Sequence, residues 1–204
     1  MLEVTSLYLK PGLDFTQVPN NAKYSASIQA LTGQPGFKIL WEGNSEWNPD
    51  FVVRLIEWRH LTDHEAYMAK KDEYAQMVNP LLEMGATERD NFIHVRHLPP
   101  SSSFLDLSLF DLAREEKVTI FWLRGSDKGS LGRFAQGVRN LHETLRRRGC
   151  RVAGGASVEQ AGECILFTHA SESGQLISRE EIDDLGMQWI LFLAGCVVCL
   201  PIPR

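Results

Sequence analysis

The chain of 204 residues consists of two similar halves, and this internal repeat limits its possible folds more than any other feature. The segment EVTSLYLKPG (residues 3–12) recurs 114 positions later as KVTIFWLRGS (residues 117–126). Three further matches follow in the same order along the chain: residues 36–39 with 149–152, 52–58 with 164–170, and 97–99 with 199–201. Ordered matches whose offsets drift slowly indicate an internal duplication.

Each half is predicted to read strand, helix, strand, strand, helix, strand. In the first half the strands are expected at about 2–10, 36–44, 50–59 and 91–98, with helices at about 20–32, 62–70 and 72–84. Apolar residues at helical spacing, such as Tyr24, Ile28 and Leu31, support the first helix, and a similar stripe predicts a helix at about 130–147. The offset between the halves drops from 112 to 102 before the last strand, so the second half is expected to lack one helical piece.

This order of elements is that of the ferredoxin-like βαββαβ unit, whose antiparallel sheet has helices on one face only. Two such units can cover their bare faces by packing sheet against sheet. We therefore expect an α+β fold of two tandem ferredoxin-like domains that form a dimeric α/β barrel within one chain. Residues 1–100 are the first domain, 101–114 a linker rich in serine at its start, and 115–204 a degenerate second domain.

Composition excludes several classes of partner. The net charge of −5 disfavours a nucleic-acid-binding protein. Four cysteines do not make a disulfide scaffold, and the first strand begins without a secretory leader, so a cytoplasmic protein is expected. The uncharged stretch 189–202 is shorter than a membrane-spanning helix and is interrupted by Gly195 and Pro201, so it is predicted to be a buried strand.

Four segments of the first half carry a family resemblance: the strand end KPG (10–12), QPGF (34–37), LIEW (55–58) and DHEAY (63–67). With these segments the chain resembles the antibiotic biosynthesis monooxygenase family of dimeric α/β barrels, in particular fungal members with two such domains in one chain. The resemblance implies cofactor-independent oxygenation of aromatic polyketides, although related barrels include polyketide cyclases, haem-degrading enzymes and proteins with no known activity. Tyr67 and Tyr74 stand near positions where many members carry histidine, which disfavours haem binding and weakens the case for an oxygenase.

Strand alternation selects the candidate site residues. On the third and fourth strands, Arg54, Trp58, His94 and Arg96 are expected to face the cavity between the two sheets, with Tyr8 of the first strand beside them. The alternate, purely apolar positions of these strands are expected to face the helices: Phe51, Val53, Leu55, Ile93 and Val95.

The residue types suggest roles for this set. His94 can act as general acid or base, because histidine changes charge near neutral pH. Arg54 and Arg96 can hold an enolate or phenolate, or can simply be ion-paired with neighbouring glutamates. A flat substrate could stack on Trp58, and Tyr67 and Tyr74 could close the mouth of the pocket, although tryptophan and tyrosine at such positions also serve as ordinary packing residues.

The repeat provides an internal control for these candidates. When the two halves are aligned, the candidates correspond to apolar or small residues of the second half: Arg54 to Leu166, Trp58 to Ala170, His94 to Cys196, and Arg96 to Val198. The second half has therefore replaced each polar or aromatic candidate by a small or apolar residue. This asymmetry predicts one site in the first half, with the second half as a scaffold.

No cofactor or metal is expected from the sequence. His60 and His64 lack a convincing third ligand, the CVVC segment (196–199) lies in a strand-like run rather than at a helix start, and no phosphate-binding glycine loop is present. We therefore expect a cofactor-free enzyme acting on a small, apolar, oxygenated substrate such as an aromatic polyketide intermediate. Oxygenation and cyclisation or isomerisation both stay open, and a non-catalytic ligand-binding barrel is the alternative. The sequence does not say whether the pseudo-dimer assembles further.

Overall fold

The computed structural model describes residues 1–13, 22–45, 48–87, 93–99, 117–125, 131–169, 181 and 187–199. The chain divides into two compact units, whose main segments are Met1–His97 and Glu116–Cys196. The predicted linker at 101–114 lies outside the described residues. How the two units pack against each other stays a prediction from the sequence.

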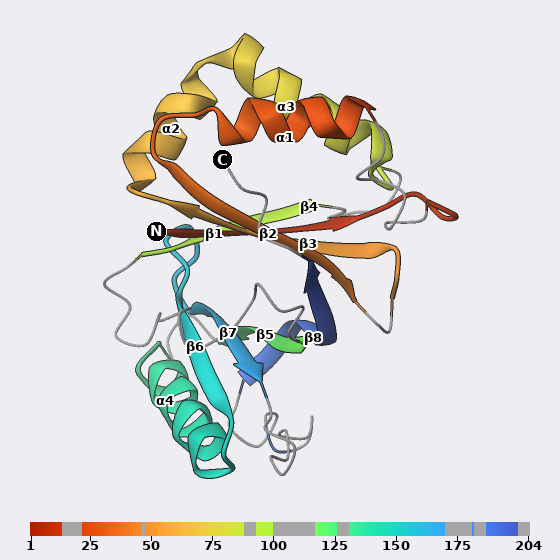
Figure 1. Ribbon diagram of the computed structural model, residues 1–204. Helices are drawn as coiled ribbons and strands as arrows, with labels where there is room; N and C mark the ends of the chain where they lie inside the picture. The colour runs from red at the N-terminus through yellow and green to blue at the C-terminus, as the bar shows by residue number, and fades with distance from the viewer. Residues whose placement is uncertain are drawn as a thin grey trace. The chain divides into compact units, whose positions relative to one another are not determined.

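The first unit has the predicted ferredoxin-like order of elements. Its sheet has the strand order β4-β1-β3-β2, β3 runs antiparallel to both of its neighbours, and the helices lie on one side of the sheet (Figure 1). In chain order the elements are β1 (Leu2–Tyr8), α1 (Ala22–Thr32), β2 (Phe37–Ser45), β3 (Phe51–Trp58), α2 (Leu61–Ala69), α3 (Lys71–Met84) and β4 (Ile93–Leu98). These bounds confirm the predicted strands and helices to within a few residues.

The core of the first unit lies between its sheet and its helices. Tyr24, Ile28 and Leu31 of α1, the stripe predicted from helical spacing, are buried against Val52 and Ile56 of β3. Burial of such a stripe supplies most of the stability of a helix of this length. The face of β3 that carries Val52 and Ile56 is therefore the face that the helices cover.

This core contradicts the expected orientation of β3. Arg54 and Trp58 alternate in phase with Val52 and Ile56, so they face the helices, whereas Phe51, Val53 and Leu55 point the other way. The sequence pattern was misleading because both faces of this strand are buried, all but one of its residues being inaccessible. A strand that is covered on both sides does not show its orientation through alternating polarity.

The second unit repeats the strand order of the first. Its strands follow the order β8-β5-β7-β6, which corresponds position by position to β4-β1-β3-β2. The elements are β5 (Lys117–Gly125), α4 (Leu131–Arg147), β6 (Arg151–Ala156), β7 (Glu163–His169) and β8 (Met187–Cys199). The stretch 189–202, which was expected to be a strand, is a strand as far as Cys199. The expected loss of one helical piece before this strand concerns a segment that lies mostly outside the described residues.

The strand registers correct the sequence alignment of the two halves. Thr5 lies opposite Arg54, and Thr119, its counterpart 114 positions later, lies opposite Thr168. Thr168 therefore occupies the place of Arg54, and Leu166 corresponds to Val52, so the predicted pairing of Arg54 with Leu166 is wrong. A slip of two residues keeps every side chain on its own face, and the hydrophobic pattern of a short strand cannot detect it.

Among the described side chains of the second unit, Cys150 and Cys164 are buried and carry free thiols. Burial raises the pKa of the Cys164 thiol to about 12. Because the thiolate is the reactive form, we expect Cys164 to resist alkylation by iodoacetamide at pH 8 in the folded protein and to react once denaturant is added. Mass spectrometry of the peptide that contains Cys164 measures both states. Rapid alkylation without denaturant would contradict the burial of this strand.

Candidate active site

Six side chains meet between the first sheet and helices α2 and α3, and we call them the Glu3 cluster. They come from β1, β3, α2, α3 and β4: Glu3, Trp58, His64, Tyr67, Tyr74 and His97. Tyr74 is half-buried and the other five are buried. The cluster thus combines one carboxyl, two imidazoles and three aromatic side chains in a protected place.

The start of α2 fixes the position of His64. Arg59 and the backbone N–H of His60 both donate to the Asp63 carboxylate in the first turn of the helix. Gly36 accepts from the Arg59 backbone N–H, has a φ of +84°, and leaves no room for a Cβ, which would lie 2.4 Å from Asp63. This turn lays the His64 ring on the last residue of β3, with the Trp58 and His64 ring centres 5.0 Å apart and their planes at 23°.

The Glu3 carboxylate is surrounded by donors. The Thr5 hydroxyl donates to Oε1 over 3.0 Å, and the Trp58 indole N–H donates to Oε2 over 2.7 Å. Nε2 of His64 lies 3.6 Å from the same Oε2. A buried carboxylate stays ionised only where such donors replace water, so this environment is suited to a charged Glu3.

The two histidines are joined by a hydrogen bond between Nδ1 of His64 and Nε2 of His97, 2.8 Å apart. One of the two nitrogens must donate and the other accept. If His64 presents Nε2–H to Glu3, its Nδ1 is the acceptor and His97 donates from Nε2. His64 and His97 then share one hydrogen bond, and the Glu3 carboxylate lies 3.6 Å from the other nitrogen of His64.

Two tyrosines from α2 and α3 pack beside Trp58 and His64. The Tyr67 and Tyr74 rings meet edge to face, with centres 5.3 Å apart, and the Tyr74 ring centre lies 6.4 Å from that of His64. Burial raises the pKa of Tyr67 to about 12, with the neighbouring Tyr74 and Glu73 adding to the shift. Burial, followed by the Glu3 charge, also raises the pKa of Tyr74. Both phenols therefore stay protonated near neutral pH and can donate hydrogen bonds.

Of the predicted site residues, Trp58, Tyr67 and Tyr74 lie in the Glu3 cluster. Arg54 lies on the same face of the sheet but is ion-paired with Glu42. The Tyr24 hydroxyl donates to the other oxygen of Glu42, and the Arg54 guanidinium lies 5.2 Å from the centre of the Tyr24 ring. Burial alone would lower the pKa of Arg54. The nearby Glu42 and Tyr24 raise this pKa by more than burial lowers it, so the net shift is upward.

The remaining candidates lie on the opposite face of the first sheet. His97 faces the helices, so His94 and Arg96 point the other way along β4. Tyr8 pairs with Phe51 on that other face, with ring centres 4.5 Å apart. The expectation that Arg54, Trp58, His94 and Arg96 share one cavity is therefore wrong. The role of His94 as a base stays a prediction that the variants below test.

Sequence reasoning missed the carboxyl and the histidine pair. In the sequence, Glu3 and His97 stand out only as matched positions of the repeat, and His64 stands out only by its spacing from His60, which lies at the exposed start of α2. Glu3 did leave a signal, since it is a charged residue between Leu2 and Val4 in an otherwise uncharged strand. The meeting of Glu3, His64 and His97 had no sequence signal, because they lie up to 94 residues apart.

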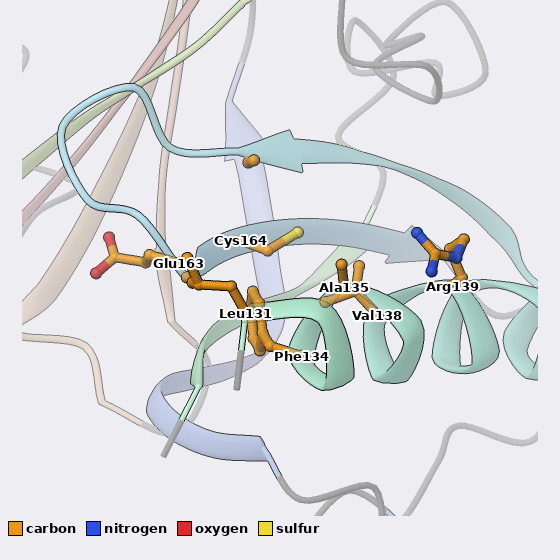
Figure 2. A pocket seen from close by; sticks show the side chains of 9 residues that line it. Leu131, Phe134, Ala135, Val138, Arg139, Glu163 and Cys164 are labelled. Carbon is orange, nitrogen blue, oxygen red and sulfur yellow. The ribbon is translucent and has the colours of Figure 1, made fainter. Parts of the chain in front are cut away.

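The second unit has a groove of about 340 Å³ between α4 and strands β6 and β7 (Figure 2). Leu131, Phe134, Ala135 and Val138 of α4 line it, together with Cys164. Figure 2 shows the Glu163 carboxylate pointing away from the helix, and this group accepts a 2.9 Å bond from Arg124. The groove is mainly apolar, with Arg139 and Glu163 as the charged residues that line it, and we regard the Glu3 cluster as the better candidate for chemistry.

Comparison with known proteins supports the fold. The chain matches no protein-family profile and no curated protein sequence. Among solved structures, it is similar to two proteins inferred to be monooxygenases. The one from Lactobacillus acidophilus NCFM is 9% identical with a TM-score of 0.52, and 97% of each chain is covered. The one from Fusobacterium nucleatum subsp. nucleatum is 11% identical with a TM-score of 0.53, covering 97% of this chain and 95% of that chain.

A third similar structure is that of an anthrone oxidase-like protein, 12% identical with a TM-score of 0.52, covering 90% of this chain and 76% of that chain. At these identities the likeness establishes the fold, which is a mixed α/β fold with antiparallel sheets, and it does not assign a reaction. Among the described residues, no helix is long and apolar enough to cross a membrane.

Proposed function

We propose that this protein is a small-molecule enzyme that removes a proton from an aromatic, polyketide-type substrate and allows the resulting anion to react with dioxygen, without flavin or haem. The observation that carries the proposal is the buried, hydrogen-bonded pair of His64 and His97 with the Glu3 carboxylate 3.6 Å from His64. The fold shared with proteins inferred to be monooxygenases supports an oxygenation, and so does the resemblance of the first half to the antibiotic biosynthesis monooxygenase family.

The histidine pair is suited to accept the substrate proton. Proton uptake makes the pair an imidazolium cation, and His64 is already 3.6 Å from the Glu3 carboxylate. Opposite charges about 4 Å apart in a protein interior with an effective dielectric constant of about 20 attract by about 4 kcal/mol. Glu3 therefore stabilises the protonated pair, and burial keeps water from competing for the proton.

The tyrosines and Trp58 are suited to hold the substrate anion. Tyr67 and Tyr74 are phenols that stay protonated, so either can donate to an enolate or phenolate oxygen. Trp58 offers an aromatic face in the same cluster. Tyr74, as the half-buried member, is the group through which a substrate would first contact the cluster.

The oxidation needs no external reductant. Loss of a proton from a CH₂ group between two aromatic rings gives a carbanion, whose electrons reduce dioxygen and form a hydroperoxide at that carbon. Elimination of water then leaves a carbonyl, so that CH₂ and O₂ become C=O and H₂O. A cyclase would use the same deprotonation but direct the carbanion at an internal carbonyl.

We also propose that the two units arose by duplication and that the second is a scaffold. The two sheets share one strand order, yet Glu3 corresponds to Lys117 and His97 to Cys199 in the repeat. The free thiols of Cys150 and Cys164 are suited to the reducing cytoplasm.

An anthrone incubated with the purified protein tests the proposal. In air, we expect consumption of one O₂ per substrate and formation of the corresponding quinone, whereas under argon the substrate should persist. Oxygen electrode traces and mass spectra of the product measure both quantities. Equal turnover in air and under argon would favour a cyclase, and tight binding without turnover would favour a ligand-binding barrel.

A further inference from the structure

We propose that Glu3, His64 and His97 form a binding site for one divalent transition-metal ion, with Zn²⁺ as the simplest probe. One ligand atom from each residue lies within 4.8 Å of the other two. The three residues come from β1, α2 and β4, and their exposed fractions are 5%, 1% and 6%. The fold thus gathers three metal-binding groups from distant parts of the first unit into a place shielded from water.

The donor set indicates the kind of ion. Two imidazole nitrogens and one carboxylate oxygen are ligands for Zn²⁺, Co²⁺ and Fe²⁺, whereas Mg²⁺ and Ca²⁺ prefer oxygen alone. Bonds of about 2.0–2.2 Å place ligand atoms of one ion roughly 3–4 Å apart. The 2.8 Å between Nδ1 of His64 and Nε2 of His97 is already close to that spacing. The widest separation between ligand atoms, at most 4.8 Å, needs to shorten by only about 1 Å. Three protein ligands leave a position open for water or another ligand.

The surroundings of Glu3 also suit a cation. Thr5 and Trp58 hold both carboxylate oxygens in place, which is how outer partners orient metal ligands. The salt-bridge partner of Glu3 is His64, which carries a charge only when protonated. The buried guanidinium on the same face, Arg54, is already paired with Glu42. A bound cation would therefore neutralise Glu3 without displacing a fixed positive group.

Metal binding and proton transfer exclude each other at this site, an inference that rests on the proposed function. Both processes need the lone pairs of the imidazole nitrogens, and the hydrogen bond between His64 and His97 cannot persist when both nitrogens bind the ion. One equivalent of Zn²⁺ should therefore abolish most of the turnover, and a chelator should restore it.

Metal binding is measured without reference to activity. Purified full-length protein, first treated with a chelator, is titrated with Zn²⁺ by calorimetry and with Co²⁺ by visible absorption. We expect one ion per chain and Co²⁺ absorption bands typical of nitrogen and oxygen ligands. His97→Gln and Glu3→Gln should each weaken binding by roughly 100-fold or more, since loss of an outer partner alone costs 10–100-fold. His60→Gln, at an exposed histidine four positions before His64, is the matched control and should bind like the wild type.

The outcomes separate this inference from the proposed function. Absence of one-to-one binding, or equal binding by wild type and His97→Gln, overturns the metal site. Binding with the expected variant pattern but no turnover of any anthrone supports the metal site and contradicts the proposed enzyme. Turnover that is unaffected by bound Zn²⁺ overturns the exclusion of proton transfer by metal.

Discussion

Turnover of an anthrone-type substrate is expected to fall by roughly 10²–10⁴-fold when His97 is replaced by glutamine, the usual contribution of a positioned proton-transfer group. Glutamine can hydrogen-bond to Nδ1 of His64 but cannot take up a proton near neutral pH. His64→Gln should cause a loss of similar size, because the pair shares one proton through a 2.8 Å hydrogen bond. Initial rates of oxygen uptake measure the effect, with circular dichroism to show that each variant is folded.

Two further histidines serve as controls for this prediction. His169 is the last residue of β7 in the second unit, so His169→Gln should leave turnover nearly unchanged. His94→Gln distinguishes the two possible faces of the first sheet, because His94 points away from the helices and His97 toward them. A large loss at His94→Gln, with full activity in His97→Gln, would move the site to the opposite face and restore the role predicted for His94 from sequence.

The largest effect on stability is expected at Arg54. Replacement by leucine leaves the Glu42 carboxylate buried without its partner, and removal of one member of a buried ion pair costs about 3–5 kcal/mol of unfolding free energy. Chemical denaturation followed by tryptophan fluorescence measures this loss. The ring of Tyr24 loses the overlying guanidinium as well, but its hydroxyl keeps Glu42 as an acceptor.

The double variant Arg54→Leu/Glu42→Leu tests the reason for that loss. Replacement of a whole buried ion pair by apolar residues is often neutral or stabilising, so the double variant should recover most of the lost stability. The Tyr24 hydroxyl then lacks its acceptor, which leaves a residual cost of about 1–3 kcal/mol that Tyr24→Phe should remove. Additive losses in the double variant would contradict the ion-pair explanation. A folded double variant without turnover would show that the Arg54–Glu42 pair is needed for catalysis.

The elements of the first unit were predictable because each depends on local pattern. Tyr24, Ile28 and Leu31 repeat at helical spacing, and α1 buries the face that carries them. The repeat of EVTSLYLKPG likewise predicted two similar halves, and the two sheets do share one strand order. The candidates Trp58, Tyr67 and Tyr74 lie together, but on the face that the helices cover rather than the face expected for Trp58, and their role in a site stays a prediction.

The orientation of the strands was not predictable in the same way. Both faces of β3 are buried, so Arg54 could not be assigned to a face by its polarity. Its charge is accommodated inside the unit by Glu42 of the neighbouring strand, a partner that only the strand register identifies. The Glu3 cluster was not predictable from the sequence either, because Glu3, His64 and His97 lie on separate elements and only the tertiary fold brings them together.

The most direct test of this account is a crystal structure of the protein soaked with an anthraquinone, the expected product. The Glu3 cluster predicts ligand density between the first sheet and helices α2 and α3, with a quinone oxygen within hydrogen-bond distance of His97, His64 or one of the two tyrosines. Density beside His94 and Arg96 on the opposite face of the sheet, or in the apolar groove along α4, would contradict the assignment of the active site to the Glu3 cluster.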